Sequence, residues 1–223
     1  MRTKFSTVGS DTADFAATAE ARVPCVIICD TSGSMTGAPI IELNDGLQVL
    51  YEELGKDPIA SVAVDVAVVT FGGTVEVAQP FATVESSFVP SLTANGDTPM
   101  GAGVSLALEI LNEQKQYYND HGIPRRRAWA FLISDGSPTD EWLTAAAQAL
   151  NLQDRESLIL YAIGVQGADM KMLARFSKTE PFALKGLHFA ELFRWVSKSM
   201  STASRRPNVD QSDVPPTNLW ANE

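Results

Sequence analysis

The sequence has little histidine and cysteine, and no long run of apolar residues. Two histidines and two cysteines among 223 residues leave few nitrogen or sulfur ligands for a transition metal. No stretch of about 18 apolar residues occurs, so we expect no membrane span. The first twenty residues carry polar or acidic side chains every few positions, so no signal-peptide core is expected there.

The two cysteines, Cys25 and Cys29, lie four positions apart on what the pattern indicates is one extended strand. At about 3.3 Å per residue they would be roughly 13 Å apart, which is too far for a disulfide. They are interpreted as small, buried core residues of a protein in a reducing compartment. A Cys-x3-Cys metal site would need further ligands, and neither another cysteine nor a nearby histidine supplies them.

Basic residues are also scarce in comparison with acidic ones. The chain has 17 Lys and Arg against 27 Asp and Glu, which gives a formal net charge of −10. This balance argues against binding nucleic acid, because that affinity depends on Lys and Arg contacts to phosphate. It also argues against an anionic membrane surface, and it favours cations or basic groups as partners.

Hydrophobic patterning predicts one domain of alternating strands and helices. With 45% hydrophobic residues the chain can bury one sizeable core. The apolar runs that predict strands are 23–29, 61–71, 74–78, 128–133, 158–163 and 181–184. The stretches with helical spacing are 39–54, 101–118, 140–150, 169–176 and 189–200. The domain is predicted to span 22–202, with a flexible N-terminal extension (1–21) and a flexible C-terminal tail (203–223) that are polar or contain proline.

This element order predicts an α/β fold with a doubly wound, mostly parallel sheet. About six strands are expected, with helices on both faces. The Gly72-Gly73 turn predicts a hairpin, and therefore one antiparallel strand at an edge of the sheet. In such sheets ligands bind beyond the carboxyl ends of the strands, where the direction of winding reverses.

Oxygen-bearing side chains gather at that predicted edge. Asp30, Ser32 and Ser34 follow the first strand, Asp135 follows the 128–133 strand, and Thr98 precedes a helix. Two carboxylates and three hydroxyls, with no nitrogen or sulfur ligand, suit a hard cation such as Mg²⁺ or Mn²⁺. Asp30→Ala is expected to abolish ion binding and to leave the fold intact, since the ligands are predicted to lie on loops.

The Asp-x-Ser-x-Ser pattern, with the later threonine and aspartate, resembles the metal-ion-dependent adhesion site of von Willebrand factor type A (VWA) domains. The resemblance covers residues 23–199 and implies a Rossmann-like VWA fold. It further implies that Ser32, Ser34 and Thr98 bind the ion directly and that Asp30 and Asp135 act mainly through water. The family's ion is usually Mg²⁺, with Mn²⁺ or Ca²⁺ as alternatives.

The stretches DTSGSMTGAPI, TPMGAGV and SDGSPTDEW look like the bacterial tellurite-resistance TerY-like subfamily. This resemblance implies a cytoplasmic protein of a stress-response system. Asp97 departs from the small residue expected before the threonine. Its carboxylate either interacts with the residues that bind the ion, without binding the ion itself, or points to solvent.

Three functions remain open. The first is a non-enzymatic module whose metal binds an Asp or Glu of a partner protein, because two carboxylates leave the ion electrophilic. The second is a Mg²⁺-dependent phosphoryl-transfer enzyme, which commonly uses a second acidic residue where Ser32 and Ser34 stand, and a lysine. The third is a scaffold with a vestigial metal site. A serine hydrolase is disfavoured because no Gly-x-Ser-x-Gly motif occurs.

Two other residues have alternative interpretations. Asp140 is expected to begin the 140–150 helix rather than to bind metal. Trp220 stands in the polar C-terminal tail, where an exposed tryptophan would suit a docking contact. Both interpretations depend on tertiary structure.

Overall fold

The computed structural model of the chain describes residues 21–206, 209 and 213–222. These residues form a seven-stranded sheet in the order β3-β2-β1-β4-β5-β6-β7. The strands are β1 (Val23–Asp30), β2 (Val64–Gly72), β3 (Thr74–Thr83), β4 (Ala128–Ser134), β5 (Leu158–Gly164), β6 (Phe182–Leu184) and β7 (Ala221–Asn222). Strands β2, β1, β4, β5 and β6 pair in parallel, and β3 and β7 are antiparallel, one at each edge. The predicted doubly wound, mostly parallel sheet is confirmed.

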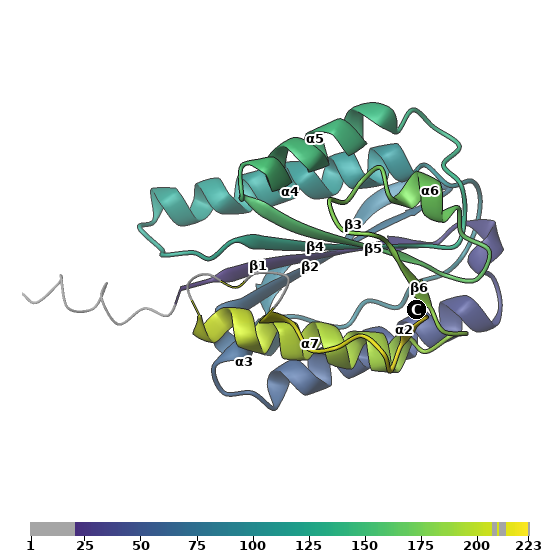
Figure 1. Cartoon of the computed structure of the whole chain (residues 1–223). Helices are drawn as coiled ribbons and strands as arrows, with labels where there is room; N and C mark the ends of the chain where they lie inside the picture. Colours follow the sequence, from purple (N-terminus) through teal and green to yellow (C-terminus); the bar gives the residue numbers. More distant parts are fainter. Residues whose placement is uncertain (1–20, 207–208, 210–212, 223) are drawn as a thin grey trace, which may run out of the picture.

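Helices cover both faces of the sheet (Figure 1). One face carries α4 (Met100–Asp120), α5 (Leu143–Asp154) and the short α6 (Met170–Leu173). The other carries α2 (Ala38–Gly55), α3 (Ala60–Ala63) and α7 (Phe189–Arg205). Two single 3₁₀ turns, η1 (Gly33–Met35) and η2 (Val84–Ser86), lie in the connections. Within the described part of the chain, no helix has the length and apolarity needed to span a membrane.

The central strands are apolar because both of their faces are covered. Every residue of β1, β2, β4 and β5 is buried. Alternate residues of β1 contribute to two separate cores: Cys25, Ile27 and Cys29 pack with α2 and α7, whereas Val26 and Ile28 pack with α4. Both cysteines are free and buried, as the strand spacing predicted.

The start of the second predicted strand is helical instead. Residues 61–63 belong to α3, and β2 begins at Val64. The Asp57 carboxylate accepts hydrogen bonds from the backbone N–H groups of Ile59 (3.0 Å) and Ala60 (3.1 Å). This local capping interaction begins a helical turn that the β-branched, apolar composition did not indicate. At the other side of the hairpin, β3 continues past Ala78 to Thr83, because an edge strand tolerates Pro80.

Two predicted helices are shorter or start later than expected. The helix expected at 140–150 begins at Leu143 and ends at Asp154. The one expected at 169–176 is the single turn α6, for which Asp169 is the N-cap and accepts from the N–H of Met172 at 3.0 Å. Asp169 was therefore correctly placed at a helix start, whereas Asp140 lies outside the helix that it was expected to begin.

A flexible tail was predicted for residues 203–223, but the described residues of this segment belong to the folded domain. Helix α7 continues to Arg205, and β7 pairs antiparallel with β6. The Trp220 side chain is 1% exposed and lies in the core between the sheet and α7. The docking role suggested for Trp220 is therefore wrong, and β7 adds a seventh strand and a second antiparallel edge to the six strands and single antiparallel edge that were expected. Residues 1–20 of the predicted N-terminal extension lie outside the described residues.

Candidate metal centre

The predicted ligands meet where the winding of the sheet reverses. Helix α2 follows β1 on one face and α5 follows β4 on the other, and β1 and β4 are neighbours at the centre of the sheet. Asp30 ends β1, and Asp135 follows the last residue of β4. The carboxyl ends of these parallel strands therefore bring the two carboxylates together.

Asp30 forms the floor of the site. Its side chain is fully buried. One carboxylate oxygen accepts from the backbone N–H of Ser32 at 2.9 Å, and the other accepts a short hydrogen bond from the Ser134 hydroxyl. Burial raises the pKa of Asp30 above its usual value, and the charge of Asp135 raises it further, although the bonds from Ser134 and Ser32 act in the opposite direction.

On the side of the site that faces solvent, side-chain oxygens lie within hydrogen-bonding distance of one another. The Ser34 hydroxyl donates to a carboxylate oxygen of Asp135 at 2.8 Å and lies 3.0 Å from the hydroxyl of Ser32. Ser32 is buried, Asp135 is half-buried and Ser34 is exposed. The oxygens therefore lead from the buried Asp30 outwards to solvent.

Thr98 joins this group through interlocked loops. The N–H of Gly33 donates to the carbonyl of Gly96 at 2.9 Å, which ties the loop after β1 to the one before α4. Thr98 and Thr139 exchange two hydrogen bonds, at 2.9 and 3.2 Å, which tie the same segment to the loop after β4. An ideal Cβ on Gly136 would lie 3.6 Å from the Thr98 hydroxyl and 3.9 Å from that of Ser34, so both hydroxyls face this glycine.

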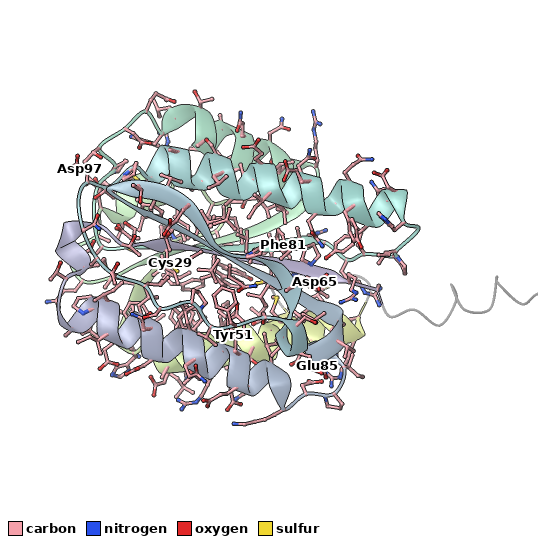
Figure 2. The ribbon with its side chains drawn as sticks, turned by 180° about the vertical axis from the view of Figure 1, so that it is seen from behind. Cys29, Tyr51, Asp65, Phe81, Glu85 and Asp97 are labelled. Carbon is pink, nitrogen blue, oxygen red and sulfur yellow. The ribbon has the colours of Figure 1, made fainter. Side chains whose placement is uncertain are left out.

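Asp97 does not point into this group. Its side chain is exposed, and within the described residues it accepts no hydrogen bond. Figure 2 shows Asp97 at one end of the sheet and Asp65 at the other. Of the two interpretations of Asp97, the structure favours the one in which its carboxylate faces solvent.

Two residues of the site were not assigned to it from the sequence. Ser134, which orients Asp30, could have been found from the parallel pairing of Cys29 with Ile133, because the next residues of the two strands then lie side by side. Asp140 does not begin its own helix. Its carboxylate accepts from the N–H groups of Gly101 (2.9 Å) and Ala102 (2.8 Å) and so caps α4, directly after Thr98.

The chemistry of the donor set fits a hard divalent cation. Five oxygen-bearing side chains converge, two of them carboxylates, and no ion pair with lysine or arginine neutralises Asp30 or Asp135 within the described chain. The same part of the chain contains no cluster of three His, Cys, Asp or Glu. A hydroxyl-rich oxygen site is therefore the kind of metal centre these residues can form.

The burial of Asp30 changes the expected effect of Asp30→Ala. The residue ends β1 rather than lying on a loop, and its removal leaves the Ser32 N–H and the Ser134 hydroxyl without their acceptor. Each buried group left unpaired costs about 1–3 kcal/mol. The expectation that this variant would leave the fold untouched is therefore not supported, and a test of metal binding is better made at Ser34 or Asp135.

Comparison with known proteins agrees with the fold. A model of the family described as von Willebrand factor type A domain matches residues 25–192. No curated protein matches the chain.

Three solved structures illustrate the likeness in fold. The pilus adhesin SpaC from Lactobacillus rhamnosus GG has a TM-score of 0.67 at 12% identity, over 81% of this chain and 30% of that one. The mussel byssus protein PTMP1 has a TM-score of 0.59 at 16% identity, over 81% and 47%. A manganese-loaded TRAP protein from Plasmodium vivax has a TM-score of 0.52 at 20% identity, over 74% and 65%. The chain thus spans about half or less of the first two proteins and under two thirds of the third.

Proposed function

The chain belongs to the von Willebrand factor type A domain family, and from this premise we propose that it is a protein-interaction module. In this proposal one divalent cation binds at Asp30, Ser32, Ser34, Thr98 and Asp135. The bound ion supplies a coordination position for an Asp or Glu side chain of a partner protein.

The observation that carries the proposal is the convergence of oxygens from three loops at the switch point of the sheet. Ser34, which lies beside Ser32, also donates to Asp135 across a sequence separation of 101 residues. Such a contact needs the fold, so it is not a local turn interaction of the kind that serines commonly make. The three loops are held to one another by backbone hydrogen bonds, which would orient the ligands before the ion binds.

The charges of the site favour an acidic partner group once the ion is present. Two carboxylates balance a divalent charge fully only when both bind it directly; acting mainly through water, as the resemblance implies for Asp30 and Asp135, they leave the ion electrophilic. Ser34 and Asp135 lie on the solvent side, so a remaining position would face outwards. A carboxylate is the hard, anionic oxygen ligand that Mg²⁺ and Mn²⁺ accept most readily.

We further propose that the ion is Mg²⁺ in the cell, that the protein is cytoplasmic, and that it acts in a bacterial stress-response or tellurite-resistance system. These parts depend on the TerY-like resemblance of the sequence motifs. Two buried free cysteines are compatible with a reducing compartment. The manganese in the TRAP structure supports testing Mn²⁺ beside Mg²⁺.

We propose a binding role rather than catalysis. Ser32 and Ser34 occupy positions where phosphoryl-transfer sites commonly carry a second acidic residue, and no lysine forms an ion pair with Asp30 or Asp135 within the described residues. Hydrolysis of a generic phosphoester that depends on Mg²⁺ and is lost in Asp135→Asn would contradict this assignment.

Calorimetric titration of the metal-stripped full chain with Mg²⁺ and Mn²⁺ tests the site. Wild type is expected to bind one ion. Ser34→Ala and Asp135→Asn are expected to weaken that binding by more than about tenfold, since the first removes a hydroxyl oxygen and the second removes a negative charge from the site. Asp97→Asn is the matched control, because it removes a carboxylate at the same end of the sheet that does not point into the site, and it should bind the ion as wild type does.

Two results would count against the proposal. Binding of the ion that is equal in wild type, Ser34→Ala and Asp135→Asn would place the ion elsewhere. Capture of a partner that is unaffected by EDTA would support the scaffold with a vestigial site instead.

A further inference from the structure

A small polar hollow opens beside the candidate metal centre. It encloses about 260 Å³ and lies between the loop after β1, the β2–β3 hairpin and the segment that precedes α4. Its lining is rich in hydroxyl groups and holds one carboxylate: Thr31, Thr70, Thr74, Glu76, Ser91, Thr93 and Asn95, with Phe88, Pro90 and Leu92 as the larger apolar members. Thr31 stands between Asp30 and Ser32, so the hollow and the metal centre share the same loop.

Two hydroxyl-bearing residues of the lining are largely buried and have no side-chain hydrogen bond within the described residues. Thr31 is 5% exposed and Thr70 is 4% exposed. Neither hydroxyl makes a hydrogen bond to any described residue, and neither is sealed from the hollow. Because both hydroxyls reach the hollow, their hydrogen-bonding capacity is available to a group that enters it.

The charge of the lining is negative and is not neutralised. Glu76 extends from β3, is exposed, and forms no ion pair within the described part of the chain. Among the described residues that line the hollow there is no lysine or arginine. Phe88, 63% exposed, presents an aromatic ring at its edge. A carboxylate, hydroxyl acceptors and an aromatic ring together suit a cationic group.

We propose that this hollow receives the basic side chain, lysine or arginine, of the same partner whose acidic group binds the metal. The inference rests on the proposed function and specifies the partner: it carries a basic residue a few positions from its acidic one. The volume is below the range of about 300–1,000 Å³ typical of small-molecule sites, which fits one side chain. The aliphatic stem would lie against Phe88 and the charged end would reach Glu76.

The spacing of the two partner residues follows from the shared loop. Thr31 is the immediate neighbour of Asp30, so the hollow begins within one residue of the metal centre. An extended peptide advances about 3.3 Å per residue. The basic residue is therefore expected within a few positions of the acidic one, on one side of it.

Peptides that vary this spacing test the proposal. Each carries one aspartate in a Gly-Ser background and one arginine at a single position, up to about six residues away on either side. Matched peptides replace arginine with citrulline, which has the same shape and no charge. Fluorescence anisotropy with the Mn²⁺-loaded full chain is expected to show a gain of about three- to fivefold for arginine over citrulline at one narrow spacing, the size of a partly exposed ion pair.

The variants Glu76→Gln and Asp97→Asn decide which carboxylate is responsible. The arginine gain should disappear in Glu76→Gln and remain in Asp97→Asn. A gain that is absent at every spacing, or that persists in Glu76→Gln, overturns the proposal even where aspartate peptides bind through the metal.

If no aspartate peptide binds, the proposed function fails and the hollow is tested alone. Titration of the full chain with n-propylguanidinium is then followed by the amide NMR signals of Thr70 and Thr93. Saturable shifts in wild type that are lost in Glu76→Gln would support a cation pocket. Their absence in wild type would exclude one.

Discussion

Trp220→Ala is expected to destabilise the whole domain, although the residue stands only three positions before Glu223. The Trp220 ring is 1% exposed, and its centroid lies 5.1 Å from that of Trp195 and 5.2 Å from that of Phe182. The backbone around it is held as well, since the N–H of Lys185 donates to the Trp220 carbonyl at 2.7 Å. The C-terminal segment therefore completes the core between the sheet and α7.

The magnitude follows from the size of the buried ring. Replacing a buried tryptophan with alanine costs about 3–5 kcal/mol. The indole N–H of Trp220 is buried without a partner in the described chain, which lowers the contribution of the wild-type residue. A loss of about 3 kcal/mol is therefore expected, and for a domain of this length it corresponds to a fall in Tm of about 6–12 °C.

Thermal unfolding followed by circular dichroism measures this effect, with Leu219→Ala as the control. Leu219 is the preceding residue and is 69% exposed, so its replacement should change stability by less than about 0.5 kcal/mol. Equal Tm values for the two variants would refute the reasoning. That result would mean that the C-terminal segment is not part of the cooperative fold in solution.

Two further predictions concern α4. Burial lowers the pKa of Lys115 from 10.5 to about 8, so between these values the unfolded chain holds a proton that the folded protein has released. The free energy of unfolding should therefore rise between pH 8 and 10.5, by up to about 3 kcal/mol. Chemical denaturation across this range should show the rise in wild type but not in Lys115→Met. Parallel pH profiles of the two proteins would contradict the buried position of Lys115. Asp140→Ala should cost about 1 kcal/mol through loss of the α4 cap, and should also weaken metal binding because Thr98 lies next to that cap. Asp140→Asn keeps one acceptor, so its Tm and its affinity for the metal should fall less than those of Asp140→Ala. An unchanged Tm in Asp140→Ala would contradict the capping role.

Much of the fold could be predicted from the sequence because its central strands are buried on both faces. The runs at β1, β4 and β5 are apolar at nearly every position, which few other local structures require. The hairpin at Gly72-Gly73 was also predicted from the sequence. The structure shows why both positions are glycine: φ is +66° at Gly73, and an ideal Cβ on Gly72 would lie 2.1 Å from the Thr31 carbonyl oxygen. The strand prediction was wrong at residues 61–63, because the Asp57 carboxylate caps the helical turn α3 there and outweighs the strand propensity of these residues.

The candidate site was predictable to a similar degree. Asp30, Ser32, Ser34 and Asp135 follow two parallel strands at their carboxyl ends, so neighbouring strands were sufficient to bring them together. Asp140 was placed at the wrong helix because its partners, Gly101 and Ala102, are almost forty residues away in sequence. The environment of Asp97 was undecided for the same reason.

The sequence by itself determined most of the order of strands and helices along the chain, the layers and the group of oxygen-bearing residues at the switch point. These depend on hydrophobic period and on short-range turn chemistry, which are local properties of the chain. Tertiary structure alone decided that Trp220 fills the core, that Asp140 caps α4, and that Thr31 and Thr70 border a hollow with unpaired hydroxyls. Each of these depends on which distant segments share a surface, and burial of a polar or aromatic side chain is decided by those neighbours rather than by the residue itself.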